Sequence, residues 1–82
     1  MHDTFLIERL YEGIKSLCTE KDIQQVDKIV IEVNTDSHVN DKSLQDIFIS
    51  RQCELITENT SIIIERTELE PLVAVIKEVE GQ

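Results

Sequence analysis

Hydrophobic side chains in the first part of the chain recur with the period of an α-helix. Between about residues 4 and 21, the apolar positions follow the i, i+3/i+4, i+7 spacing that gathers them on one helical face. They are Leu6, Ile7, Leu10, Tyr11, Ile14, Leu17 and Cys18. Asp3 or Thr4 can supply an N-cap oxygen, and a polar run at 20–22 closes the segment. The pattern predicts an amphipathic helix.

The hydrophobic period changes to two between residues 26 and 34, where β-branched side chains dominate. One face of this segment carries Ile29, Ile31 and Val33, and the other carries Lys28, Val30 and Glu32. We therefore predict a strand that is covered on one face. Residues 34–37 have the composition of a turn and form the loop that follows.

A second helix is predicted to start at Asn40 or Asp41 and to run to about Cys53. Its apolar residues form two stripes, roughly 120–180° apart at the 100° step of an α-helix. The first stripe is Leu44, Ile47, Phe48 and Leu55, and the second is Ile49, Cys53 and Ile56. A helix that is apolar on two sides either packs between two layers or ends before it includes its second stripe.

Two further strands are predicted near the end of the chain. Residues 60–66 contain the apolar run Ile62-Ile63-Ile64, and residues 72–79 form a second β-branched segment with Pro71 in front of it. Their connection at 67–71 is short, so we expect the two strands to pair antiparallel. The whole pattern predicts a two-layer α+β fold of order α-β-α-β-β, with two helices packed on one face of a three-stranded sheet. Residues 1–82 then form a single domain.

Charge and composition exclude several classes of function. The chain has 82 residues with 8 Lys plus Arg against 17 Asp plus Glu, which gives a formal net charge of −9. Such a balance argues against a nucleic-acid interface, which needs a basic surface, and against an anionic membrane surface. The two cysteines, and the lack of a signal-peptide pattern or a long apolar run, predict a cytoplasmic protein without a disulfide framework.

Sequence motifs of catalysis do not occur. Glycine is found only at Gly13 and Gly81, which leaves no phosphate-binding loop. The chain contains no Gly-x-Ser-x-Gly elbow, no His-Glu-x-x-His helix and no Cys-x-x-Cys pair. With few convergent polar groups and a small core, we do not expect an enzyme.

The chemistry-bearing feature is the N-terminus, Met1-His2-Asp3. The α-amine, the backbone nitrogen of His2 and its imidazole Nδ1 can bind one metal ion by closing a five-membered and a six-membered chelate ring. The backbone nitrogen or the carboxylate of Asp3 can complete a fourth position. Nitrogen-rich, near-planar sites suit Ni(II) or Cu(II), whereas structural zinc prefers a tetrahedral cage. A plainer interpretation also stands, in which His2 is an arbitrary residue of a frayed terminus and Asp3 is a helix N-cap.

His38 and the two cysteines have plainer interpretations as well. His38 falls in a predicted loop, where a ligand role is the minor alternative. Cys18 and Cys53 are expected to be small buried hydrophobic residues on the two helices rather than metal ligands or redox centres.

The N-terminus and the order of the predicted elements together resemble the HypA family, the nickel-insertion proteins for hydrogenase and, in some bacteria, urease. Family members begin Met-His-Glu, continue as an amphipathic helix and a β-branched strand, and open the second helix with a Ser-x-Val-x-Pro-Glu-x-Leu stretch. The corresponding stretches here are Met1-His2-Asp3, Lys28-Ile29-Val30-Ile31-Glu32-Val33 and Ser37-His38-Val39-Asn40-Asp41-Lys42-Ser43-Leu44. Ile62-Ile63-Ile64-Glu65 and Val75-Ile76-Lys77-Glu78-Val79-Glu80 resemble the last two strands of the family.

The chain also departs from the HypA pattern. The family carries a zinc ribbon with two Cys-x-x-Cys pairs between its last two strands, whereas only residues 67–71 lie there in this chain, so no zinc is expected. Asp3 replaces the family glutamate, and Asp41-Lys42 replaces its proline–glutamate pair.

The resemblance implies a nickel metallochaperone domain for hydrogenase or urease maturation, which binds Ni(II) transiently and works with a HypB-type GTPase or other maturation proteins. Met1 and His2, together with Asp3, are the metal ligands that the resemblance implies. The alternative is a divergent HypA-like protein-interaction domain with no metal role, in which the second apolar stripe is a partner or homodimer surface.

Overall fold

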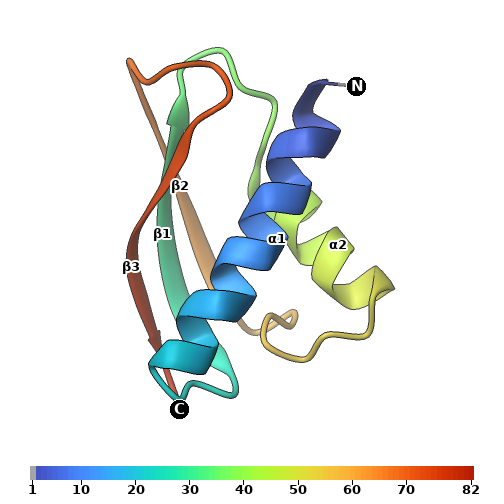
Figure 1. Cartoon of the computed structure of the whole chain (residues 1–82). Helices are drawn as coiled ribbons and strands as arrows, with labels where there is room; N and C mark the ends of the chain where they lie inside the picture. The colour runs from blue at the N-terminus through green and yellow to red at the C-terminus, as the bar shows by residue number, and fades with distance from the viewer. Residues whose placement is uncertain (1) are drawn as a thin grey trace.

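The computed structural model has its helices and strands in the order that the sequence pattern predicts. It describes the backbone of residues 2–82 and the side chains of residues 4–82. The elements are α1 (His2–Glu20), β1 (Val26–Asn34), α2 (Asp41–Ser50), β2 (Ser61–Thr67) and β3 (Ala74–Gly81). Both helices lie on the same face of the sheet, as Figure 1 shows, so the predicted two-layer α+β fold is confirmed.

The sheet has the strand order β2-β1-β3, and its pairing differs from the prediction. β1 lies in the centre, parallel to β2 and antiparallel to β3. β2 and β3 therefore lie on opposite sides of β1 and do not pair with each other. The antiparallel pair expected from their short connection is wrong.

β1 is the most buried of the three strands, which fits its central position. Ile29, Ile31 and Val33 belong to the core beneath the helices, and Val30 on the opposite face is only 8% exposed. A β2–β3 hairpin would leave this strand at an edge of the sheet, whereas in the observed order β2 and β3 flank it and the helices cover one of its faces. α2 lies between β1 and β2 in the chain and supplies the crossover that their parallel pairing requires.

The hydrophobic core lies between the helices and the sheet. α1 contributes the predicted apolar face, and α2 contributes Leu44 and Phe48, neither of which retains exposed surface. The rings of Phe48 and Tyr11 meet at a centroid distance of 4.8 Å, which joins the two helices. The buried core residues are Leu6, Leu10, Tyr11, Ile14, Cys18, Val26, Ile29, Ile31, Val33, Val39, Leu44, Phe48 and Ile56.

α2 is shorter than predicted because a Schellman motif ends it. The N–H of Cys53 donates to the carbonyl oxygen of Phe48 at 2.9 Å, around Gln52, whose φ is 56°. The helix stops at Ser50, so Cys53 lies in the following loop and not on a helix, and the predicted second stripe is not a helical face. The predicted start is confirmed, with Asn40 as N-cap.

α1 starts earlier than predicted. It begins at His2, so the predicted N-cap residues Asp3 and Thr4 lie within its first turn instead of in front of it. Just after the C-terminal end of α1, Asp22 adopts the left-handed conformation, with a φ of 58°.

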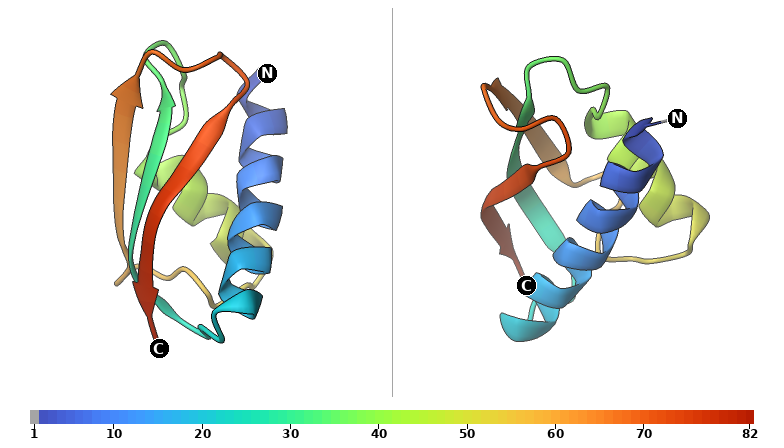
Figure 2. Two further views of the ribbon diagram at one scale, coloured as in Figure 1. Left: turned by 60° about the vertical axis from the view of Figure 1, so that its left-hand side comes forward. Right: turned by 45° about the horizontal axis from the view of Figure 1, so that its top comes forward.

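The connection between β2 and β3 crosses the end of β1 and lies beside the start of α1 (Figure 2). The side chain of Asn34, at the end of β1, holds this connection by donating to the carbonyl oxygen of Leu69. β3 starts at Ala74, two residues later than predicted, because the N–H of Val73 closes a turn onto the carbonyl oxygen of Glu70 at 3.1 Å.

Candidate functional site

The predicted metal site lies at the start of α1, at the limit of what the structure describes. Met1 is outside the described residues, and so are the side chains of His2 and Asp3. The backbone of His2 and Asp3 forms part of the first turn of α1. The N–H groups of a first helical turn have no acceptor within the helix. A metal ion that bound these two backbone nitrogens would therefore displace no hydrogen bond of the helix.

An apolar groove runs beside the N-terminal half of α1. It has a volume of about 220 Å³ and lies between Leu6 and Leu10 of α1 and the segment Leu72–Val73 in front of β3. Phe5 is 54% exposed and Leu72 is 53% exposed, which adds apolar surface near the same end of the molecule. The start of α1 is thus close to exposed apolar surface of the kind that marks interaction sites.

His38 lies in the loop between β1 and α2, as predicted, and is exposed. Its carbonyl oxygen accepts a hydrogen bond from Asn40 Nδ2 at 3.5 Å, close to the N-terminus of α2. Across the part of the chain that the structure describes, no three His, Cys, Asp or Glu residues converge to hold a metal ion. Metal binding thus remains a prediction about the N-terminal residues alone.

The two cysteines are free and differ in their burial. Cys18 is buried on α1, as predicted, whereas Cys53 is half-buried in the loop after α2. Burial raises the pKa of the Cys18 thiol above its ordinary value, and the nearby Cys53 raises it further. A raised pKa keeps the thiol protonated near neutral pH and makes it a poor nucleophile.

A second apolar depression, which we call the α2 hollow, lies where α2 ends. It has a volume of about 280 Å³ and is lined by Phe48, Ile49, Cys53, Ile56, Glu54 and Glu58, among others. Ile49 is 49% exposed, whereas Ile56 is buried in the core. The sequence pattern placed Ile49, Cys53 and Ile56 on one stripe but assigned Phe48 to the other. It also missed the two glutamates, because their place depends on the path of the loop at 51–60.

Similarity to known proteins does not assign the chain to a family, since no family model, no curated protein and no solved structure matches it. The resemblance to HypA therefore depends on the short motifs and the order of elements given above. Within residues 2–82, neither helix combines the length and the hydrophobicity that a membrane span needs.

Proposed function

We propose that the chain is a nickel-binding metallochaperone domain, similar to HypA, that acts in the maturation of hydrogenase or urease. It chelates Ni(II) through the N-terminal amine, backbone nitrogens and His2, with Asp3 as a further ligand. One observation supports this above all: His2 and Asp3, which follow Met1 in the sequence, form the start of a helix, and the first-turn nitrogens of a helix have no acceptor within it. The order α-β-α-β-β is also the one that the resemblance to HypA implies.

The electrostatics of α1 favour such a complex. A divalent ion bound by two deprotonated backbone nitrogens and one carboxylate carries about one net negative charge. α1 is 19 residues long, and the positive end of its macrodipole lies at His2. A negative group at an exposed helix N-terminus is stabilised by about 0.3–1 kcal/mol.

Binding requires the loss of protons and therefore depends on pH. The α-amine titrates at about 7.7–8.0 in model peptides. Because the metal competes with a proton for this nitrogen, the affinity for Ni(II) rises as the pH approaches this value. A large second side chain also protects Met1 from enzymatic removal, which keeps the α-amine in place.

Isothermal titration of Ni(II) into protein with a native, unblocked Met1 at mildly alkaline pH tests the proposal. We expect binding of one ion per chain, together with the absorbance of square-planar Ni(II). His2→Ala should abolish this binding. His38→Ala is the matched control, because it removes an exposed histidine from a loop and should leave the affinity unchanged.

A second control blocks the α-amine without altering any native side chain. Acetylation of Met1 converts the free amine into an amide, so the chelate should be lost. Weak binding to the native chain, or binding that persists in His2→Ala, contradicts the proposal.

The proposed partners follow from the resemblance to HypA. They are a HypB-type GTPase or another maturation protein in the cytoplasm, to which the domain hands its Ni(II). We also expect zinc to bind far more weakly than nickel, because the connection between β2 and β3 contains no cysteine.

A second candidate is a divergent interaction domain without a metal role, and the half-exposed Ile49 favours it. Sedimentation at several protein concentrations tests whether this surface forms a homodimer. A monomer at all concentrations, with Ile49→Ser harmless to partner binding, counts against this candidate.

A further inference from the structure

We propose that the α2 hollow binds a basic amphipathic helix of a partner protein. The partner inserts an aliphatic side chain next to Ile49 and places Lys or Arg beside Glu54 and Glu58, which line the same hollow. This inference is independent of the metal site and stands whether or not the N-terminus binds nickel.

The hollow is large enough to receive an anchor side chain of a partner. Its volume is about 280 Å³, at the lower limit of the roughly 300–1,000 Å³ of pockets that enclose small ligands. Its inner wall is preformed, because Phe48 is fully buried and packs on Tyr11 at 4.8 Å, and Ile56 is part of the same core. A rigid apolar wall with a half-exposed isoleucine at its edge fits the pattern of a buried interface anchor.

The charges around the hollow are negative. Glu54 and Glu58 are exposed, and within residues 4–82 no Lys or Arg lines the hollow. α2 ends beside it without a basic residue in its last turn, so the negative end of the helix dipole adds to the carboxylates. A cation is therefore favoured at the rim.

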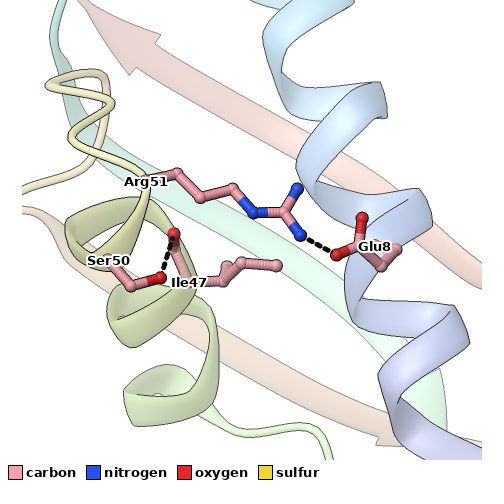
Figure 3. Close-up of polar contacts among 4 residues, drawn as sticks. All are labelled: Glu8, Ile47, Ser50 and Arg51. Carbon is pink, nitrogen blue, oxygen red and sulfur yellow. Dashed lines mark hydrogen bonds and ion pairs between the residues drawn. The ribbon is translucent and has the colours of Figure 1, made fainter.

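Arg51, the basic residue nearest in sequence, does not neutralise this rim. Its guanidinium reaches across to α1, where it forms an ion pair with Glu8, as Figure 3 shows. It also lies 4.7 Å from the ring centre of Tyr11. These contacts direct the positive charge of Arg51 toward α1.

The same charges disfavour other occupants of the hollow. In a symmetric dimer the same patch of each copy meets its equivalent, so Glu54 and Glu58 of two chains with a net charge of −9 would face each other. An anionic lipid surface is repelled for the same reason. A basic protein segment is the class of partner that satisfies both the apolar wall and the acidic rim.

Binding of model peptides to the ¹⁵N-labelled chain tests the inference. The probe is a leucine–lysine peptide about four helical turns long with one apolar face, compared with its leucine–glutamate and serine–lysine counterparts. At about physiological salt, where exposed charges are screened beyond about 8 Å, only the leucine–lysine peptide should bind. The amide resonances of residues 48–58 should shift on binding.

Matched variants separate a specific site from general attraction to an acidic protein. Ile49→Ser should weaken binding at least about tenfold, and Glu54→Gln with Glu58→Gln about threefold to tenfold. Ile63→Ser is the control for an exposed isoleucine, on β2, and Glu68→Gln with Glu70→Gln removes the same charge at the far end of the sheet. Both controls should leave the affinity unchanged.

Several outcomes overturn the inference. The first is that the leucine–lysine peptide does not bind. The second is that Glu68→Gln with Glu70→Gln weakens its binding as much as Glu54→Gln with Glu58→Gln does. The third is that the amide resonances that shift are scattered over the whole surface. Equal binding of the leucine–glutamate peptide overturns the charge assignment. Self-association that Ile49→Ser abolishes would show a second copy as the occupant and would also overturn it.

Discussion

Gly81 is the position where the addition of one methyl group should disturb the sheet most directly. It lies at the end of β3, opposite Val26 of β1. A Cβ at this position would overlap the backbone carbonyl oxygen of Gln25 and would lie 2.9 Å from Cγ2 of Ile23. Because the overlapping atom belongs to the backbone, no side-chain rotation relieves it, and Gly81→Ala must push the end of β3 away.

The backbone hydrogen bonds at the end of β3 limit how far Gly81→Ala can lower the free energy of unfolding. Three backbone hydrogen bonds join Gln82 to residues 24 and 25, at 2.7, 3.0 and 3.1 Å. At about 1 kcal/mol each, their loss sets an upper limit of about 3 kcal/mol. The freedom regained by the released residues and the lower entropy of alanine in the unfolded chain offset part of this. We therefore expect Gly81→Ala to lower the free energy of unfolding by about 1–2 kcal/mol.

The same substitution at Gly13 should act in the opposite direction. Gly13 lies in the middle of α1, and a Cβ there would meet Cδ1 of Ile76 at 3.8 Å, an ordinary van der Waals contact. Alanine is favoured over glycine inside a helix, so Gly13→Ala should raise the free energy of unfolding by about 0.5–1 kcal/mol. Urea denaturation of the three proteins, followed by circular dichroism, measures both values. A Gly81→Ala chain as stable as the wild type, or a destabilised Gly13→Ala chain, would refute the packing described at these positions.

Three further predictions concern the helix ends and the core. Gln52→Gly should raise the free energy of unfolding by up to about 1 kcal/mol, because glycine accepts the positive φ of 56° without strain, and Gln52→Ala in the same urea assay should bring no gain. Phe48→Ala should lower the free energy of unfolding by about 3–5 kcal/mol, because the ring is fully buried against Tyr11, with thermal denaturation as the measurement. Iodoacetamide should modify Cys53 faster than Cys18, because burial raises the pKa of the Cys18 thiol. Mass spectrometry of the labelled native protein measures the order of modification. If Cys18 were labelled first, the result would contradict its burial.

The sequence predicts the elements well where a local pattern determines them. The α1 face, the alternation in β1 and the start of α2 at Asn40 follow from neighbours in the chain, and the structure confirms them. The end of α2 was missed because Gln52, rather than the usual glycine, takes the left-handed conformation that stops the helix. No residue preference marks such a position.

Strand pairing was predicted wrongly because it depends on the whole sheet. The short connection between β2 and β3 favoured a hairpin, yet the more decisive signal was Val30 between Ile29 and Ile31. In a central strand, residues of both neighbouring strands flank such a side chain even on the face that no helix covers, and Val30 lies between Ile63 and Glu78. Alternation alone treated Val30 as a residue of the exposed face.

The two candidate sites differ in how far the sequence could predict them. The proposed chelating atoms at Met1 and His2 are consecutive along the chain, so their chemistry can be predicted without the fold. The α2 hollow required the fold, because Ile49 and Glu58 meet only through the path of the loop that follows α2.

The fold also keeps these two sites apart. α1 starts beside the connection that follows β2, whereas the loop of the α2 hollow leads into the start of β2, at the opposite end of that strand (Figure 1). β2 has 7 residues, which at about 3.3 Å per residue separates its ends by about 20 Å. The two sites lie near opposite ends of this strand and the residues that line the α2 hollow include none of the proposed metal ligands, so the effects of substitutions should be independent.

Because the two sites should be independent, each proposal can be refuted without affecting the other. His2→Ala should leave the affinity for the leucine–lysine peptide unchanged, and Ile49→Ser should leave the affinity for Ni(II) unchanged. If the peptide did alter the affinity for Ni(II), linkage requires Ni(II) to alter the affinity for the peptide by the same factor. α1 would be the element that transmits the effect, because Arg51 at the end of α2 is paired with Glu8 of α1. Arg51→Met should then abolish the coupling while both single affinities persist, which titrations of each ligand in the presence of the other would measure.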